Sequence, residues 1–465
     1  MKAMSLRQIA AACGGHYYGD KTKLDMEVTG VAIDSRKVEE GFLFVPIKGA
    51  RVDGHSFIPQ VMKKGALCTL SEVELENASH PYILVDSSEQ ALKDLAEHYR
   101  KALDIKVIGI TGSVGKTSTK EMIGSVLSQK YNVLKTAGNF NNEIGLPLTI
   151  FNIRDEHEVA VLEMGISDFG EMHRLAKMAR PDICVITNIG LCHLENLGDR
   201  DGILKAKTEM FDFAQPNATI ILNGDDDKLI TVKDWDGYAP LYFGLSTEMN
   251  AFAKDIHSLS LKGTACTLCL GDNSFEVTIP IPGHHMVYNA LAGALVGREL
   301  GLSTDEIKAG IEALVPVSGR NNLIETDSLM IIDDCYNANP VSTKASLDVL
   351  ATADTRKVAI LGDMFELGEN EKELHYGVGK HAAEKEIDLV ICIGGLSENT
   401  AKGASYSNSE VRYFETKADF LAQIDKFLKK GDTVLVKASH GMEFPEIVER
   451  LKELTLKYLK KATKV

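Results

Sequence analysis

The stretch at residues 109–120, GITGSVGKTSTK, combines glycines with a lysine and hydroxyl side chains. Backbone N–H groups of residues 113–117, at the start of a helix, would face an anion, and the helix dipole would add to the attraction. Lys116 would reach the β and γ phosphates, and the Thr117 hydroxyl would coordinate Mg²⁺. Strict phosphate-loop spacing wants a glycine where this chain has Ile110. We nevertheless expect a nucleotide loop formed by Gly112, Ser113, Val114, Gly115, Lys116, Thr117 and Ser118.

A magnesium–phosphate site needs further ligands, and three segments offer them. Glu163 lies near the end of the apolar run EVAVLEM, on the side of a parallel sheet where ligands bind. His193, in TNIGLCHLENLG, can present a neutral imidazole to a metal. Taken alone, each is more often a surface charge or an ordinary loop histidine. LKAKTEMF adds Lys205 and Lys207, which residue chemistry alone does not distinguish.

These residues need a sheet to position them. The apolar run at 105–110 followed by helical spacing at 116–130 is the strand, loop and helix that a phosphate loop requires. Further strands are predicted at 158–164 and 182–190, with helical segments between them, which favours a mostly parallel sheet covered by helices. A hairpin-like insertion at 259–281 precedes another predicted helix.

A chain of 465 residues should form about three domains. Short β-branched runs and helical stretches indicate a small α/β domain near the N-terminus. Alternating strands and amphipathic helices in the last third predict a second doubly wound domain. The predicted fold class is therefore α/β with three domains: a small N-terminal α/β domain at 1–103, a central P-loop ATPase-like, mostly parallel sheet with a β insertion at 104–316, and a C-terminal Rossmann-like doubly wound domain at 317–465.

Composition excludes several classes of protein. The net charge of −15 argues against a broad nucleic-acid surface, which needs many lysine and arginine contacts to phosphate. No run approaches the roughly 18 apolar residues of a membrane-spanning helix, so we expect a cytoplasmic protein without membrane insertion. Among eight cysteines, Cys266 and Cys269 form a close pair on a predicted strand, and buried free thiols are the simpler interpretation than zinc.

Ten strings in order give a specific resemblance: TGSVGKTS, GNFNNEIGLP, LEMG, NIGLCHLE, AKTEMF, GHHMVYNALAG, SGR, DDCYNANP, LGDMFELGE and LVKAS. Together they resemble the ATP-dependent Mur ligases, which assemble the cell-wall peptide, and the match covers nearly the whole chain. That family spells its loop Thr-Gly-x-x-Gly-Lys-Thr, as residues 111–117 do. DDCYNANP and LGDMFELGE resemble the members that add D-alanyl-D-alanine, which implies UDP-N-acetylmuramoyl-tripeptide and D-alanyl-D-alanine as substrates.

The resemblance implies roles for individual residues. Lys116 and Thr117 would hold the phosphates of ATP with two Mg²⁺ ions. Glu163 and His193 would be magnesium ligands, and Lys207, in its Ala-Lys-x-Glu setting, would carry a carbamate derived from CO₂. Asn289 would face adenine, while residues of the C-terminal domain would close over the nucleotide. Those closing residues are Arg320 and Asp334.

The resemblance also assigns regions to the substrates. The N-terminal domain would hold the UDP end, GNFNNEIG would lie beside the muramoyl peptide, and YNANP with LGDMFELG would lie beside the dipeptide. The substrate residues are Asp34, Ser35, Arg36, Asp53, Gly54, His55, Asn139, Asn141, Asn142, Tyr336, Asn337 and Asn339.

Two segments depart from the family, and other functions stay open. Pro46 stands in FVPIKG where most relatives carry alanine. The chain reads KASHG at 437–441 where the family usually reads Lys-Gly-Ser-Arg. The alternatives are a sister ligase adding a diamino acid, a folylpolyglutamate-type ligase, a P-loop ATPase or small-molecule kinase, and a non-catalytic nucleotide-binding protein. A monomer is the simpler expectation, and the third peptide residue is left open between lysine and a diaminopimelate.

Overall fold

The computed structural model describes the backbone of residues 1–49, 51–76 and 78–462, and the side chains of those residues as far as Leu454. Contacts between Cα atoms divide the chain into two compact units. The first contains residues 1–111, 130–185 and 206–220, and the second contains residues 112–129, 186–205 and 221–465. Each unit is described by itself.

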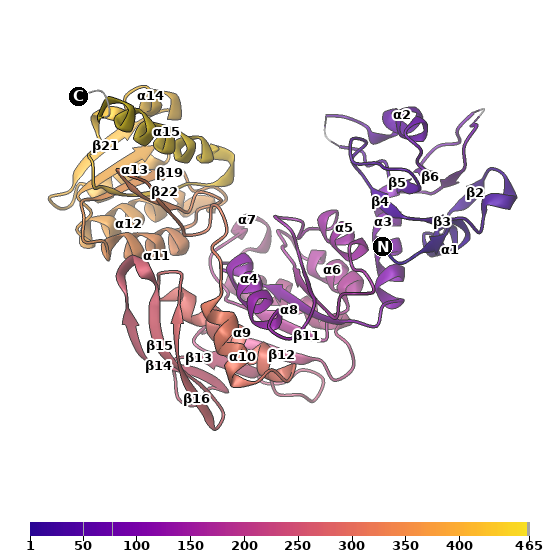
Figure 1. Ribbon diagram of the computed structural model, residues 1–465, viewed down its shortest axis with the longest axis horizontal. Helices are drawn as coiled ribbons and strands as arrows, with labels where there is room; N and C mark the ends of the chain where they lie inside the picture. The colour runs from indigo at the N-terminus through magenta and orange to yellow at the C-terminus, as the bar shows by residue number, and fades with distance from the viewer. Residues whose placement is uncertain (50, 77, 463–465) are drawn as a thin grey trace. The chain divides into compact units, whose positions relative to one another are not determined.

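The first unit begins with a small five-stranded sheet (Figure 1). Its order is β2-β7-β6-β5-β4, with β2 antiparallel to β7 and the other pairs parallel. A separate pair joins β1 (Met4–Ser5) to β3 (Glu27–Val28). The remaining elements are β2 (His16–Tyr18), β4 (Gly30–Ala32), β5 (Phe42–Phe44), β6 (Cys68–Ser71), β7 (Tyr82–Leu84), α1 (Leu6–Ala12), α2 (Ile58–Lys63) and α3 (Ser88–Lys101).

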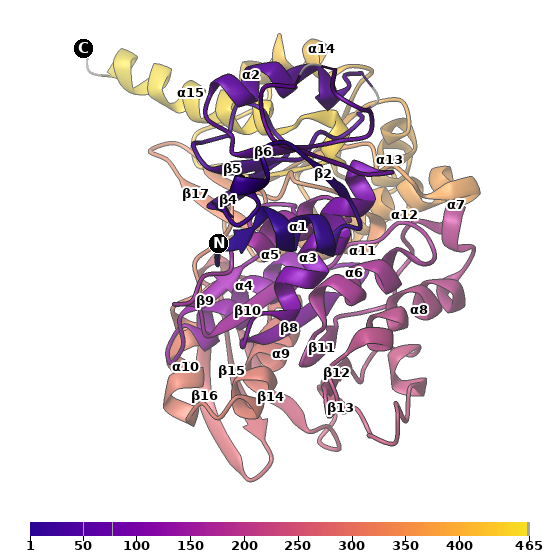
Figure 2. The same cartoon turned by 90° about the vertical axis from the view of Figure 1, so that its right-hand side faces the viewer.

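The first unit also holds strands in the order β9-β10-β8-β11, and β10 pairs in parallel with both β8 and β9. Every residue of β10 is buried, as expected of a strand covered on both faces. α5 contacts β10, α6 contacts β8, and α3 packs on α5 and α6 (Figure 2). The bounds are β8 (Lys106–Thr111), β9 (Val133–Lys135), β10 (Val159–Glu163), β11 (Ile183–Ile186), α5 (Gly145–Phe151) and α6 (Glu171–Ala179). The predicted strands at 105–110, 158–164 and 182–190 are confirmed.

In the second unit, β12 to β16 follow one another in sequence order. The hairpin insertion predicted at 259–281 is present as β15 and β16, which pair antiparallel. β14, which was not predicted, pairs antiparallel with β15 and in parallel with β13. Cys266 and Cys269 are both buried and free. The elements are β12 (Thr219–Asn223), β13 (Leu241–Gly244), β14 (Ala251–Ser258), β15 (Thr264–Leu270), β16 (Asn273–Ile279), α4 (Lys116–Leu127), α7 (Leu194–Leu197), α8 (Arg200–Thr208), α9 (His285–Glu299) and α10 (Thr304–Glu312).

The last third forms a six-stranded sheet in the order β17-β18-β22-β19-β20-β21, parallel except for β17. The apolar runs SLMIIDDCY, KVAILGDM, DLVICIGG and DTVLVKAS, which predict the strands of this domain, form β18, β19, β20 and β22, whereas β17 and β21 were not predicted. The bounds are β17 (Asn322–Glu325), β18 (Met330–Asp333), β19 (Lys357–Gly362), β20 (Leu389–Ile393), β21 (Glu410–Phe414), β22 (Thr433–Lys437), α11 (Pro340–Ala351), α12 (Glu371–Glu384), α13 (Ser397–Ala404), α14 (Lys417–Leu421) and α15 (Pro445–Ala462).

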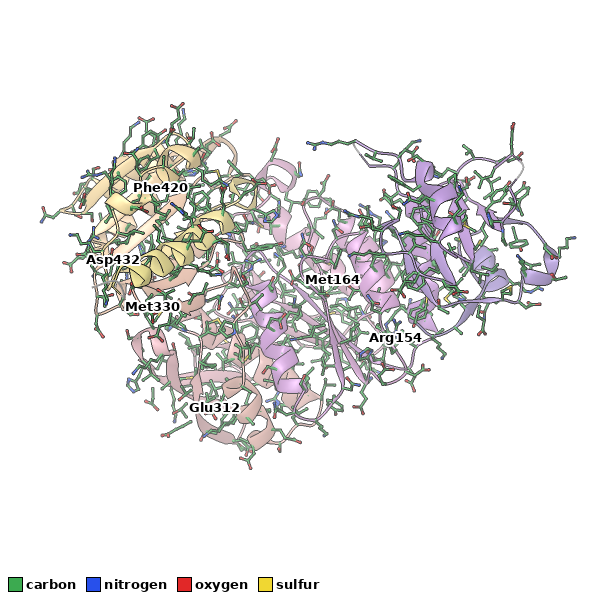
Figure 3. The ribbon with its side chains drawn as sticks, turned by 45° about the horizontal axis from the view of Figure 1, so that its top comes forward. Arg154, Met164, Glu312, Met330, Phe420 and Asp432 are labelled. Atoms are coloured by element: carbon green, nitrogen blue, oxygen red, sulfur yellow. The ribbon has the colours of Figure 1, made fainter. Side chains whose placement is uncertain are left out.

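Alternate residues of this sheet enter two cores. Ile331 and Val434 pack with Phe420 beneath α14 and α15, while Ile332 and Leu435 pack on the other face beneath α11, α12 and α13 (Figure 1). Figure 3 labels Phe420 within this region. The doubly wound arrangement leaves the loops after β18, β19, β20 and β22 at one edge of the sheet, where ligands bind in such folds.

Within the described part of the chain, no helix has the length and apolarity needed to cross a membrane.

Candidate active site

The phosphate loop, residues 112–118, leads into α4. Gly115 has φ 83° and is the residue before the helix, a left-handed conformation that glycine adopts without strain. Gly112 has φ 151°, and a Cβ there would lie 1.9 Å from Thr187 Oγ1. The two glycines are therefore required by backbone conformation and by close packing, as expected of a loop that admits a phosphate chain.

Asn188 holds this loop from outside. Its side-chain oxygen accepts the Val114 N–H at 2.9 Å, its Nδ2 donates to Val114 O at 2.9 Å, and its backbone oxygen accepts the Ser113 N–H at 3.0 Å. The amides of Ser113 and Val114 thus bind Asn188, although they were expected to face an anion. The N-terminus of α4 carries the positive end of the helix dipole, which favours a bound anion.

A cavity of about 250 Å³ in the second unit adjoins this loop. Lys116 lines it, with Nζ donating to Gly112 O at 2.8 Å across the loop. Several predicted nucleotide and dipeptide residues share the cavity although they lie far apart in sequence. The predicted residues that line it are Ser113, Val114, Gly115, Lys116, Thr117, Ser118, Asn289, Arg320, Asp334, Asn337 and Asn339.

Asn289 enters the cavity from α9. It is 6% exposed, and its Oδ1 accepts a hydrogen bond from Thr119 Oγ1 at 3.0 Å. Two α9 neighbours that were not predicted also line the cavity, His285 and Tyr288. Burial lowers the pKa of His285, which favours a neutral imidazole. Burial together with the charge of Asp225 raises the pKa of Tyr288, whose hydroxyl donates to Asp225 Oδ2 at 3.0 Å.

Asp334 is the centre of a buried polar network. Lys437 Nζ donates to Asp334 Oδ2 at 2.5 Å, and Ser346 Oγ donates to the same oxygen at 2.6 Å. The Asn321 N–H donates to Asp334 Oδ1 at 3.0 Å. Sequence reasoning assigned Asp334 to the nucleotide and did not single out Lys437, although LVKAS was among the matching strings. The structure makes them an ion pair on the cavity wall.

Arg320 and Tyr336 form a stacked pair next to this network. The Arg320 guanidinium lies 4.1 Å from the Tyr336 ring centroid, a cation–π geometry. The His440 ring lies 5.2 Å from the Tyr336 ring at an angle of 38°. His440 belongs to the KASHG segment, which departs from the family pattern. It therefore contacts Tyr336, a residue predicted to bind the dipeptide.

Glu163 and Lys207 lie in the first unit. Glu163 ends β10 and is 2% exposed; its Oε1 accepts from Asn141 Nδ2 at 2.9 Å and its backbone N–H donates to Thr136 Oγ1 at 2.9 Å. Lys207 is 1% exposed near the end of α8, whose last three residues, 206–208, belong to the first unit. Figure 3 labels Met164, the buried residue that follows Glu163. The structure therefore fixes Glu163 through Asn141, a residue predicted to contact the muramoyl peptide.

The neighbouring asparagines differ in what they do. Asn142 Oδ1 accepts from the Gly145 N–H at 2.8 Å at the start of α5, so it helps to begin that helix. Asn139 is exposed. Asn141 therefore joins the predicted substrate segment to Glu163, while Asn142 has a local structural role.

His193 and Thr117 lie in the second unit. His193 precedes α7 with φ 51°, and its Nδ1 is 3.0 Å from Glu366 Oε2. Among the residues that the structure describes, no group of three or more His, Cys, Asp or Glu side chains is assembled as a metal site. The donor types of the predicted set, a hydroxyl, a carboxylate and an imidazole, still fit a hard cation that keeps several waters.

The two predicted UDP-binding turns are each closed by their own hydrogen bonds. Asp34 accepts from Arg36 Nη2 at 2.7 Å, and the hydrogen bonds of Arg36 lower the pKa of Asp34 to about 2. Ser35 O accepts from Lys64 Nζ at 2.9 Å.

In the second turn, Asp53 Oδ1 accepts from the His55 N–H at 3.0 Å. A Cβ on Gly54 would lie 2.8 Å from the backbone of Ile47, which explains the glycine. Both turns thus have a defined shape before any ligand binds.

Comparison with known proteins agrees with this architecture. Three family models match successive parts of the chain. They are the Mur ligase family catalytic domain at residues 27–100, the Mur ligase middle domain at 110–297, and the Mur ligase glutamate ligase domain at 319–440.

The chain is similar to the UDP-N-acetylmuramoyl-tripeptide–D-alanyl-D-alanine ligases of Bacillus subtilis (40% identity over 92% of this chain and 94% of the relative) and Escherichia coli (34%, over 97% and 99%). Among solved structures it resembles MurF from Acinetobacter baumannii (TM-score 0.90, 31% identity, 97% and 99% coverage). It also resembles the MurF ligase from Thermotoga maritima in complex with ADP (TM-score 0.83, 31% identity, 92% and 98% coverage).

Proposed function

Because the chain belongs to the Mur ligase family, we propose that it joins D-alanyl-D-alanine to UDP-N-acetylmuramoyl-tripeptide in an ATP-dependent step of peptidoglycan precursor synthesis. The observation that carries the proposal is the cavity that the phosphate loop shares with Arg320, Asp334, Asn337 and Asn339. A nucleotide loop and the segment that resembles a dipeptide site thus meet at one cavity. A simple ATPase or kinase has no need of the C-terminal residues that resemble a dipeptide site.

The chemistry follows from the difficulty of making an amide from a carboxylate in water. The γ-phosphoryl group of ATP passes to the tripeptide carboxylate and gives an acyl phosphate and ADP. The dipeptide amine then attacks the acyl carbon, and phosphate leaves from the tetrahedral intermediate with loss of the amine proton. Lys116 stabilises negative charge on the transferring phosphoryl oxygens, and Asn188 keeps the loop in shape for it. Positioning of three substrates can contribute about 7–11 kcal/mol, so no protein nucleophile is needed.

The metal and carbamate assignments form a finer part of the proposal. Thr117, Glu163 and His193 would hold magnesium, which supplies charge neutralisation at the phosphates. Lys207 would carry a carbamate, and its nearly complete burial fits this role because a buried charge is stable beside an opposite charge, which magnesium would supply to a carbamate.

The carbamate has a direct test. Wild-type protein equilibrated with ¹³C-bicarbonate should give a carbamate carbon signal in NMR that Lys207→Ala lacks. The variant should be nearly inactive and partly restored by short carboxylic acids. Full activity of Lys207→Ala, or the same signal in it, would refute the carbamate.

The reaction itself is tested by phosphate release from ATP. UDP-N-acetylmuramoyl-tripeptide is supplied with D-alanyl-D-alanine, with a diamino acid, or with no acceptor. We expect release that depends on D-alanyl-D-alanine and a product joined through a new amide. Release with the diamino acid would favour the sister ligase, and release without any acceptor would favour an ATPase.

The proposal also includes a cytoplasmic monomer. All eight cysteines are free, which agrees with a reducing compartment. Fractionation of cells and light scattering of the purified protein test the two points separately.

A further inference from the structure

Glu366 lies in the segment Asp363–Gly368 after β19, here called the acceptor loop. Its side chain is 67% exposed, and its Oε2 lies 3.0 Å from Nδ1 of His193. Its φ of 61° is left-handed, a conformation that non-glycine residues adopt infrequently. Glu366 therefore has an uncommon backbone conformation, and its carboxylate contacts His193, which lies outside the C-terminal sheet.

Three side chains from later in the chain pin the loop just before Glu366. The Met364 N–H donates to His375 Nε2 at 2.9 Å, and the Phe365 N–H donates to Ser439 Oγ at 2.9 Å. Asp363 Oδ1 accepts from both the N–H and the Oγ of Ser397 at 2.7 Å. Side chains of α12, α13 and the segment after β22 thus hold the backbone just before Glu366. The position of Glu366 therefore depends on the packing of the whole C-terminal domain.

The neighbouring carboxylates are already used by their own domain. Asp333 accepts from the Gly319 N–H at 2.8 Å, Asp334 is paired with Lys437, and Asp363 is bound by Ser397. All three are buried. Of these four carboxylates after β18 and β19, Glu366 is the exposed one, and it is the one that contacts His193.

The reaction demands such a group. The dipeptide arrives as an ammonium cation, and its nitrogen must be held close to the acyl phosphate before it attacks. A carboxylate binds an ammonium group through charge-assisted hydrogen bonds, which are about twice as strong as neutral ones. His193 belongs to the set proposed to surround the phosphates, so a carboxylate beside His193 is where an ammonium should be held.

We infer that Glu366 recognises the ammonium group of the incoming dipeptide and positions its nitrogen beside His193. This inference rests on the proposed function, because it concerns the acceptor of that reaction. The bond between Glu366 and His193 is exchanged for one between Glu366 and the ammonium group when the dipeptide binds. Removing the charge of Glu366 should therefore affect the dipeptide and leave the other two substrates unaffected.

The test compares two ligands that differ in the amino group. N-propionyl-D-alanine has hydrogen in place of the ammonium and serves as a competitive inhibitor. In Glu366→Gln, the KM for D-alanyl-D-alanine should rise about 10- to 100-fold, the range for losing a hydrogen bond to a charged group. The inhibition constant of N-propionyl-D-alanine and the KM values for ATP and the UDP-substrate should change by less than about threefold.

Glu369→Gln is the matched control, since Glu369 is exposed in the 3₁₀ turn that follows the loop. It should behave as wild type. Equal weakening of dipeptide and inhibitor in Glu366→Gln, an unchanged KM for the dipeptide, or the same rise in Glu369→Gln would overturn the inference.

Glu366→Asp keeps the charge on a shorter stem and should retain more discrimination between the two ligands than Glu366→Gln. It is also the variant to measure if thermal unfolding shows that Glu366→Gln is not folded, and loss of all discrimination in Glu366→Asp would count against the inference in that case. Wild-type protein that releases no phosphate in response to D-alanyl-D-alanine would contradict the proposed function itself, which separates the two failures.

Discussion

The phosphate loop and the acceptor loop are both turns that follow a strand, but they are stabilised differently. In the phosphate loop the conformation comes from neighbouring residues: Gly112, Gly115 and the Lys116 bond to Gly112 O lie within five positions, with Asn188 as the distant support. The acceptor loop depends on His375, Ser397 and Ser439, which follow it by 11, 34 and 74 positions along the chain. The conformation of the phosphate loop can therefore be recognised from a short string, whereas that of the acceptor loop depends on side chains from distant parts of its domain.

The largest effect should come from Lys116. In Lys116→Ala, kcat should fall about 100- to 1000-fold, because a charged group that stabilises the transferring phosphoryl oxygens is lost. Thermal unfolding should change much less than kcat, since a hydrogen bond such as the one from Lys116 Nζ to Gly112 O contributes about 1–3 kcal/mol to stability. Phosphate release and a melting curve measure the two. If Lys116→Ala unfolds at a much lower temperature but keeps the wild-type kcat per folded molecule, the role of Lys116 is structural and the prediction is wrong.

Asn188 tests how far the phosphate loop depends on a distant residue. Asn188→Ala removes two hydrogen bonds to Val114, so the KM for ATP should rise about 10-fold. The KM for the dipeptide should stay the same. An equal rise in the KM for the dipeptide would show that the phosphate loop and the acceptor loop are not independent of each other.

His375 is the corresponding test in the acceptor loop. It is fully buried, with Nε2 accepting from Met364 and Nδ1 bonded to Glu371 O at 2.6 Å. His375→Ala should lower the free energy of unfolding by about 1–3 kcal/mol and raise the KM for the dipeptide severalfold, with the KM for ATP unchanged. Urea unfolding and steady-state kinetics measure these changes. A selective rise in the ATP KM would show that the acceptor loop is misassigned.

The same histidine gives a pH dependence. Burial lowers the pKa of His375 in the folded protein, so the unfolded chain binds a proton first as the pH falls. The stability contribution is complete above the unfolded pKa of about 6.5 and is lost as the pH decreases from there toward the lower folded pKa. Urea unfolding between about pH 5 and pH 8 should show a steeper loss of stability in wild type than in His375→Ala. Identical slopes would mean that His375 titrates alike in both states.

Ser439 should give the smallest effect. Ser439→Ala removes one hydrogen bond, from the Phe365 N–H, which is worth about 1 kcal/mol, so the KM for the dipeptide should rise by less than about fivefold. The KM for ATP is the internal control. Because Ser439 lies in the variant KASHG segment, a rise larger than that of His375→Ala would show that this segment contacts the dipeptide directly.

Sequence patterns predicted the architecture well where apolar runs are long. The strands β8, β10, β19, β20 and β22 are nearly continuous apolar stretches because helices cover both faces of these sheets, and that pattern can be read without a structure. β17 and β21 lie at the sheet edges and are at most half-buried, so their sequences lack that pattern and were not predicted. Such edge strands are recognised only in the structure, from their hydrogen bonds to the neighbouring strands β18 and β20.

The site was predicted unevenly for a related reason. Residues 112–118 were predicted together because they form one short string of sequence, and all but Gly112 line the cavity. Lys437 was not singled out, and its role became visible through its bond to Asp334, 103 positions earlier. His285 precedes Asn289 by four positions on α9 and Tyr288 by three, so once Asn289 is placed in the cavity helix geometry brings His285 to the same face, and Tyr288 beside His285.

The sequence by itself determined the fold class, the phosphate loop and the resemblance to one ligase family, because these depend on periodicity and on short strings of neighbouring residues. Only the tertiary structure decided that Asn188 holds the phosphate loop, that Lys437 pairs with Asp334, that Asn141 fixes Glu163, and that Glu366 lies beside His193. The physical reason is range: a hydrogen bond or ion pair acts over about 3 Å in space, whatever the separation of its partners along the chain.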